Sequence, residues 1–167
     1  GLLVLACRYA HLLLMMDLWH YARVLATRAD PEVGAVSEGL VGESKRRVLV
    51  EARAFIPDEI LLCGHSIGAA LAVRLAAELL AESQPAHVLT LGSGLLQVAC
   101  HPKATELRAM ATRLLDEQVH WLDVQALIDP INFLDSDLAQ MYSTPSMNYR
   151  EIVVRMRHLL SSATYRR

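Results

Sequence analysis

The chain has 167 residues, 53% of them hydrophobic, and a formal net charge of −2. This size and apolar content suit one globular domain or part of a larger one, and they exclude a disordered chain, which needs low hydrophobicity and high net charge. Because 16 basic residues nearly balance 18 acidic ones, we expect no nucleic-acid partner. Three widely spaced cysteines, an odd number, argue against a disulfide framework or a zinc site and favour a reducing, cytoplasmic location.

The first 16 residues, GLLVLACRYAHLLLMM, are strongly apolar but are interrupted by Arg8 and His11. Because the chain starts at Gly1 inside this stretch, we expect a fragment of a longer protein. No uninterrupted apolar run reaches the roughly 18 residues that a transmembrane helix needs. We therefore predict a buried amphipathic helix here, with membrane association through residues 1–30 as the alternative, and a core domain over residues 31–167.

Helical spacing of apolar residues predicts a first helix over residues 12–26, which the pair Asp30-Pro31 ends. Residues 32–43 contain three glycines and little periodicity, and they are predicted to form a loop or a weak helix. A second helix is expected over residues 44–55, before Pro57.

From residue 58 onward, the pattern alternates between strands and helices. Short apolar runs predict strands at 59–64, buried on both faces with Cys63 in the core, at 87–91 and at 119–127. Helices are predicted over residues 69–82, 103–118 and 149–161, and an irregular stretch over 128–147. This order predicts an α/β fold of three layers, α/β/α, around a mainly parallel sheet.

The segment Gly64-His65-Ser66-Ile67-Gly68 matches the pattern GxSxG between a predicted strand and a predicted helix. In such a turn the serine adopts a strained backbone conformation, and we expect Gly64 and Gly68 to be needed because larger side chains would collide. Ser66 is then exposed at the carboxyl edge of the sheet. There the backbone N–H of Ile67, at the start of the helix, is suited to stabilise an oxyanion.

The run GHSIGAALAVRLA resembles the nucleophile elbow and following helix of the α/β-hydrolase superfamily, in the style of serine lipases and esterases. The downstream turn Thr90-Leu91-Gly92-Ser93 is similar to fungal-type lipases, and the run WLDVQALIDPINFLDSDL resembles uncharacterised bacterial hydrolase-like proteins. The resemblance implies a partial α/β-hydrolase fold and an acyl-enzyme chemistry that needs no cofactor or metal.

In this superfamily the serine is followed along the chain by an acid and then by a histidine. Asp129 suits the acid, because it follows a predicted strand and therefore reaches the same sheet edge as Ser66; an aspartate that caps a turn is the alternative. Asp123 lies in the middle of a strand, where its side chain is expected to point either into a helix layer or at a partner. Asp135 and Asp137 are expected to be solvated loop residues or weak cation ligands, and they rank below Asp129.

His158 is the one histidine that follows Asp129, but it falls within the predicted helix over residues 149–161 rather than on a loop. His65 precedes the serine and is expected to be partly buried, with its ring turned away from the nucleophile. The other histidines break the family order. The base is therefore either His158 or a residue beyond Arg167, and the second oxyanion donor is expected from a strand before Gly1.

Three functions remain open at this point. The first is a serine hydrolase of small-molecule or lipid carboxylic esters that acts through Ser66. The second is a catalytically degenerate domain that serves as a membrane-associated or protein-interaction module. The third is acyl transfer to an acceptor other than water, which would use the same residues.

Overall fold

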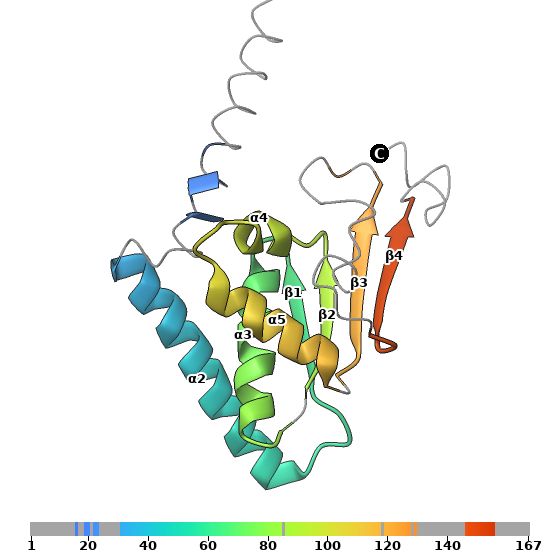
Figure 1. The fold of residues 1–167 in the computed structure, drawn as a ribbon. Coiled ribbons are helices and arrows are strands. Elements are labelled where there is room, and N and C mark those ends of the chain that lie inside the picture. Colours follow the sequence, from blue (N-terminus) through green and yellow to red (C-terminus); the bar gives the residue numbers. More distant parts are fainter. Residues whose placement is uncertain are drawn as a thin grey trace, which may run out of the picture.

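The structure, a computed structural model, describes residues 16, 19–20, 22–23, 31–84, 86–117, 119–127, 129 and 146–155. Side chains are described from residue 35 within the first long helix. The elements, in chain order, are α2 (Pro31–Phe55), β1 (Leu61–His65), α3 (Gly68–Ala81), β2 (His87–Leu91), α4 (Leu95–Ala99), α5 (Thr105–Asp116), β3 (Trp121–Ala126) and β4 (Tyr149–Val154) (Figure 1).

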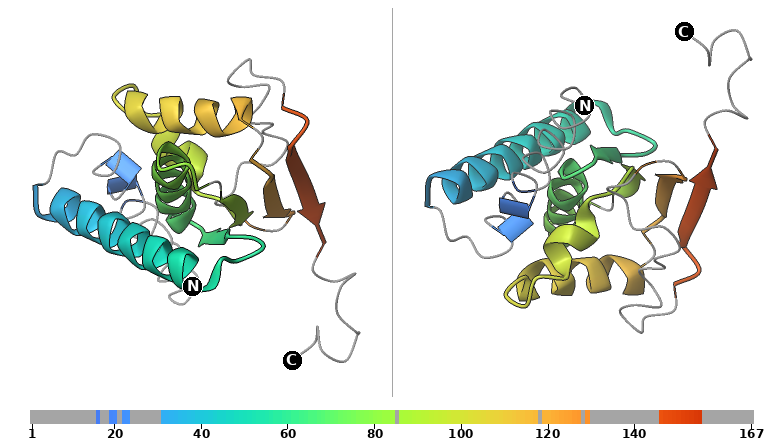
Figure 2. Two further views of the ribbon diagram at one scale, coloured as in Figure 1. Left: turned by 90° about the horizontal axis from the view of Figure 1, so that it is seen from below. Right: turned by 90° about the horizontal axis from the view of Figure 1, so that it is seen from above.

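The four strands form one parallel sheet in the order β1-β2-β3-β4. Each strand therefore lies beside its neighbour in sequence, and all four carboxyl ends meet at the same edge of the sheet. The strand–helix order with parallel pairing confirms the predicted α/β class and mainly parallel sheet. It is consistent with the predicted three-layer arrangement, in which the described helices α3 and α5 supply the layer on one face (Figure 2).

The core lies between this face of the sheet and the helices α3, α4 and α5. Helix α3 presents a row of small side chains, including Ala69, Val73 and Ala76, which are fully buried and let the helix approach the strands closely. Trp121 of β3 is fully buried in this core, and its ring packs edge-on against that of Tyr149 in β4 at 5.6 Å between ring centroids. Ala22, far upstream in the sequence, also joins this core.

The opposite face of the sheet is more accessible. Within the described residues, Leu61 of β1 is 55% exposed and Cys63 is exposed, whereas Leu62 is half-buried and Gly64 is buried. The prediction that this strand is buried on both faces, with Cys63 in the core, is therefore wrong for the part of the molecule that the structure describes. The sequence run was uniformly apolar, so its composition did not distinguish the covered face from the open one.

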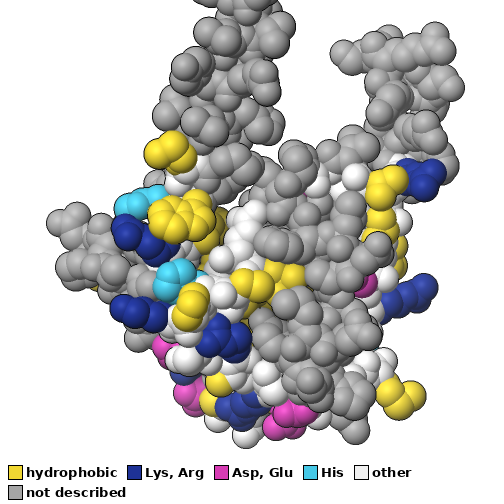
Figure 3. Space-filling view, turned by 45° about the horizontal axis from the view of Figure 1, so that its top comes forward, with side chains coloured by type: hydrophobic (Ala, Val, Ile, Leu, Met, Phe, Trp, Pro, Cys, Tyr) yellow, Lys and Arg dark blue, Asp and Glu magenta, His cyan; other side chains and the backbone are white. Residues whose placement is uncertain are grey.

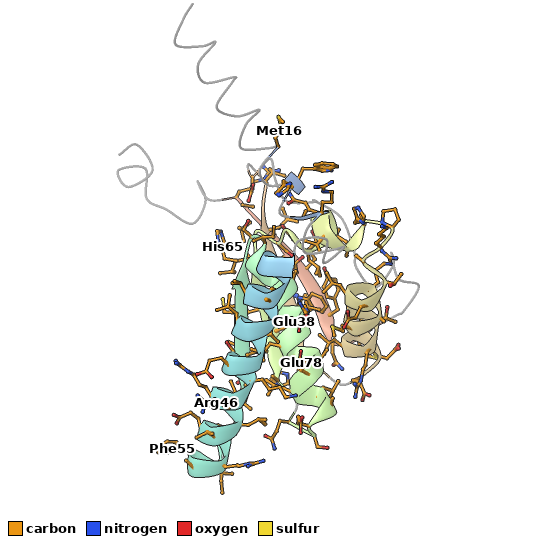
Figure 4. The ribbon with its side chains drawn as sticks, turned by 90° about the vertical axis from the view of Figure 1, so that its left-hand side faces the viewer. Met16, Glu38, Arg46, Phe55, His65 and Glu78 are labelled. Atoms are coloured by element: carbon orange, nitrogen blue, oxygen red, sulfur yellow. The ribbon has the colours of Figure 1, made fainter. Side chains whose placement is uncertain are left out.

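Helix α2 is continuous from Pro31 to Phe55, so residues 32–43 are helical, and of the two predictions for them, a loop or a weak helix, the loop is wrong. Its contacts with α3 explain the difference. Arg74 of α3 donates to Ser37 Oγ at 3.0 Å and pairs with Glu38 at 2.7 Å, and Lys45 pairs with Glu82 at 3.0 Å. Tertiary contacts of this kind outweigh the low helix propensity of glycine. Figure 4 shows Glu38 and Glu78 where α2 lies alongside α3.

The C-terminal part of the described chain contains the largest disagreement with the sequence. Residues 149–154 form strand β4, not the start of a helix, and pair with β3 along its whole length. The short helix α4 was not predicted, and α5 is slightly shorter than the predicted helix over 103–118. The remainder of the predicted helix over 149–161, from residue 156 onward, lies outside the described residues.

Among the described residues, no helix combines the length and apolar character that crossing a membrane would need. On the face shown in Figure 3, basic, acidic and hydrophobic side chains are interspersed over the described surface. The predicted apolar helix over residues 1–16 lies outside the described residues, apart from Met16.

Candidate active site

The backbone at Ser66 turns sharply between strand β1 and helix α3. Ser66 has φ = 53°, in the left-handed region that non-glycine residues seldom adopt. Its N–H donates to the Leu91 carbonyl at 3.0 Å, and its own carbonyl accepts from the N–H groups of Gly94 at 2.9 Å and Ala69 at 3.1 Å. The turn at Ser66 is thus held by β2, by the segment after β2 and by α3, which is what keeps a strained conformation in place.

Gly64 and Gly68 flank this turn but are not equivalent. A Cβ built on Gly64 would lie 2.7 Å from Ala69 Cα and 2.8 Å from the Gly68 carbonyl oxygen, both backbone atoms, so no side chain fits there. At Gly68 a Cβ would meet no described atom within 4 Å outside its own stretch of helix. The expected steric need for glycine therefore holds for Gly64 and is wrong for Gly68 among the described residues, because the space around a Cβ at residue 68 is open.

The hydroxyl of Ser66 and the N–H of Ile67 both lack a hydrogen-bond partner among the described residues. Ile67 precedes the first residue of α3, where helix N–H groups have no intrahelical acceptor and the helix dipole is positive. The hydroxyl of Ser93, which follows the neighbouring strand β2, differs from that of Ser66 because it has a hydrogen-bond partner. Ser93 is 5% exposed, and its Oγ accepts the N–H of Leu95 at 3.2 Å, so that hydroxyl serves the start of α4.

Asp129 lies at the same sheet edge, three residues after the end of β3. Its N–H donates to the Ala126 carbonyl at 3.0 Å, which forms the turn, and its side chain is half-buried. The carboxylate reaches toward β2, because Oδ2 would lie 3.0 Å from a Cβ built on Gly92. Gly92 and Gly94, which contact Asp129 and Ser66, have Cα atoms no more than roughly 7 Å apart. The structure therefore brings the predicted nucleophile and the predicted acid to one turn.

Asp123 has a different environment from Asp129. It is 2% exposed on the helix-covered face of β3, where its carboxylate accepts from Thr90 Oγ1 at 2.6 Å, Gln125 Nε2 at 2.6 Å and Tyr149 Oη at 3.5 Å. Trp121 Nε1 donates to Thr90 Oγ1 at 3.0 Å and extends the network. Burial raises the pKa of the Asp123 carboxyl, and the hydrogen bonds from Thr90, Gln125 and Tyr149 oppose that shift in part. Asp123 is thus a buried network residue, away from the edge where Ser66 lies.

No described histidine forms a hydrogen bond with the Ser66 hydroxyl. His87 and His120 lie at the amino ends of β2 and β3, the opposite edge of the sheet, where their rings meet at 4.8 Å. His101 Nδ1 accepts the Lys103 N–H at 3.2 Å. His65 is exposed at the carboxyl end of β1, not partly buried as expected (Figure 4).

His158, Asp135 and Asp137 lie outside the described residues. The finding that residues 149–154 form a strand nevertheless changes the sequence argument about His158. That residue follows β4, the strand after the one that leads to Asp129. The predicted helix over residues 149–161 was the argument against His158 as the base, and residues 149–154 of that segment form a strand instead.

No group of three or more metal-binding side chains occurs in the described part of the chain.

No protein-family model matches this chain, and no match was found among the curated proteins or the solved structures. The interpretation of the site therefore depends on the residues and their geometry.

Proposed function

We propose that this chain carries the catalytic elbow of a serine hydrolase that acts on carboxylic esters. The observation that carries the proposal is the backbone of Ser66, a non-glycine residue with φ = 53° between a parallel strand and a helix. Three hydrogen bonds to its backbone N–H and carbonyl maintain this conformation, while its hydroxyl has no described partner. Strain held in this way at an accessible hydroxyl is typical of a catalytic site rather than of a structural turn.

In the proposed reaction, Ser66 Oγ attacks the ester carbonyl carbon, and a histidine accepts the hydroxyl proton. The N–H of Ile67 donates to the oxyanion that forms. The histidine then protonates the departing alkoxide, which leaves as an alcohol. Water attacks the acyl-enzyme by the same route, releasing the carboxylic acid and restoring Ser66.

We assign the acid role to Asp129 and the base role to His158. Asp129 is supported by its position after β3 at the edge where Ser66 lies, and by its carboxylate, which points back toward the end of β2. His158 is supported by its place in the sequence after β4, the next parallel strand, because the carboxyl ends of parallel strands share an edge. A base contributed from outside residues 1–167 is the alternative for this role.

The test is covalent labelling of the purified chain with a fluorophosphonate, read by intact mass. Attack by Ser66 Oγ on phosphorus expels fluoride and leaves one phosphonyl adduct per chain. We expect an adduct on the parent, none on Ser66→Ala, and one adduct still on Ser93→Ala, whose serine is buried at the neighbouring strand end. His158→Gln should slow labelling by about 100-fold or more if His158 is the base.

Two results would contradict this assignment. An adduct that persists in Ser66→Ala would show that another residue reacts. No adduct on the parent, at reagent concentrations that label an active serine esterase, would favour the second candidate, a degenerate domain that acts as an interaction module. The absence of any hydrogen bond from Ser66 Oγ to a described histidine is the observation that favours this second candidate.

A further inference from the structure

The turn Gly92-Ser93-Gly94, which joins β2 to α4, contacts the side chain of Asp129 and the backbone of Ser66. At one end, the Gly92 N–H donates to the Val124 carbonyl of β3 at 2.8 Å. At the other end, the Gly94 N–H donates to the Ser66 carbonyl at 2.9 Å. The turn therefore connects the backbone of β3, which leads to Asp129, with the backbone of Ser66.

Both glycines are closely surrounded by the groups proposed to act in catalysis. A Cβ on Gly94 would lie 3.2 Å from the carbonyl carbon of Ser66 and 3.3 Å from the backbone nitrogen of Ile67. A Cβ on Gly92 would lie 3.0 Å from Asp129 Oδ2. Any side chain would thus press on the proposed oxyanion donor at one end of the turn and on the proposed acid at the other.

Gly92 is constrained in two separable ways. Its φ of 50° favours glycine, but asparagine also adopts this conformation at little cost. The contact with Asp129 applies to any side chain, asparagine included, because a Cβ at this position would displace the carboxylate. The position of the carboxylate, rather than the turn conformation alone, accounts for glycine here.

We propose, resting on the proposed function of Ser66, that Gly92 and Gly94 are positioning residues for the proposed acid and oxyanion donor. Gly92 leaves the space that sets the orientation of the Asp129 carboxylate. Gly94 allows the Ser66–Ile67 peptide to lie where its N–H faces the oxyanion. Catalytic geometry of this kind is sensitive to displacements well below 1 Å.

The experiment measures the fluorophosphonate labelling rate of Ser66 in the full chain as a function of pH. Asp129→Asn removes the charge that favours the protonated base, and it should slow labelling and lower the midpoint of the pH profile. Gly92→Ala should slow labelling by about tenfold or more and shift the midpoint in the same direction. The double variant should be no slower than Asp129→Asn alone, because both changes act on the same carboxylate.

Gly94→Ala should slow labelling to a similar extent without moving the midpoint, since it displaces the oxyanion donor and leaves the acid in place. Gly39→Ala is the matched control, because a Cβ there meets nothing within 4 Å and the residue lies on α2. Its labelling rate should equal that of the parent. Gly92→Asn tolerates the positive φ, so it serves as the test if Gly92→Ala does not fold.

The outcomes separate this inference from the proposed function. If the parent is labelled and Asp129→Asn is slow, but both Gly92 variants react at the parent rate with the parent midpoint, the positioning role is overturned and the proposed function stands. The same holds if the Gly92→Ala and Asp129→Asn effects multiply in the double variant. An unlabelled parent overturns both proposals.

Discussion

At the scale of single residues, two aspartates only six positions apart have opposite environments. Asp123 is buried beneath the helices and accepts hydrogen bonds from Thr90 and Gln125, whereas Asp129 is half-buried at the sheet edge, with its carboxylate against Gly92. The difference follows from the strand, because Asp123 lies within β3 and Asp129 lies after its end. Both aspartates follow the GxSxG segment along the chain, so their distance from it in sequence does not distinguish the buried residue from the one at the sheet edge.

The raised pKa of Asp123 predicts a pH-dependent contribution to stability. Because burial raises the pKa in the folded chain above the ordinary value of 3.8, the folded state holds the proton at pH values where the unfolded state has lost it. The free energy of unfolding should therefore fall as the pH rises from about 3.8 through the folded-state pKa, and then level off. Asp123→Asn has no such proton, so its stability relative to the parent should increase across the same window.

Urea denaturation at a series of pH values measures this difference. Gln125 can accommodate the substitution, because its Oε1 has no described hydrogen-bond partner and would accept the new amide N–H after the Gln125 amide turns over. Asp116→Asn, an exposed change at the end of α5, is the control and should stay within about 0.5 kcal/mol of the parent at every pH. Parallel curves for Asp123→Asn and the parent would show that Asp123 does not carry the titration.

At the scale of elements, the turn between β1 and α3 is built on close backbone contact. Gly64→Ala should destabilise the chain by about 2 kcal/mol or more, because the new Cβ meets backbone atoms of Ala69 and Gly68 that move only with the helix. Gly68→Ala should be neutral or stabilising by up to about 1 kcal/mol, since the position is open and alanine is the better helix former. Urea denaturation of the two variants side by side tests this, and equal losses would mean that the two flanking glycines share one steric role.

Elements with strong local signals were predictable from the sequence. Strand β2 and helix α3 combine an apolar run with clear boundaries, and the pattern around Ser66 located the turn between strand and helix. Strand β4 was not predictable in this way. The apolar residues Ile152, Val153 and Met156 fit helical spacing, and the pairing that makes this segment a strand comes from β3, more than 20 residues earlier in the chain.

The candidate site shows the same division between local and distant information. Ser66, Gly64 and Ile67 belong to one continuous pattern, so the sequence identified them together. The close approach of Gly92 to Asp129 joins residues 37 positions apart, and no single-sequence pattern encodes it. The predicted parallel sheet was enough to place Ser66 and Asp129 at one edge, though not to define the contact between Gly92 and Asp129.

At the scale of the whole molecule, β1 is an edge strand within the described chain, and a groove of about 380 Å³ runs beside it. The groove is lined mainly by apolar side chains of α2, β1 and α3, among them Leu40, Leu61 and Leu71. An open strand edge beside an apolar groove is uncommon in a stable monomer, because unpaired backbone groups invite pairing with another strand. Whether a further strand pairs with the open edge of β1 is therefore a question that can be answered by measurement on the whole molecule.

Hydrogen exchange of individual amides gives this measurement. The Ile60 carbonyl accepts from His87 and the Ser66 N–H donates to Leu91, so the even-numbered residues of β1 point their backbone groups toward β2. In a parallel ladder the N–H and the carbonyl of one residue both point toward the same neighbouring strand, and those of the next residue both point to the other side. The amides of Leu62 and Gly64 should therefore exchange slowly, and those of Leu61, Cys63 and His65 should exchange rapidly. Protection of all five amides in the purified chain would mean that a further strand pairs with the open edge of β1 in solution.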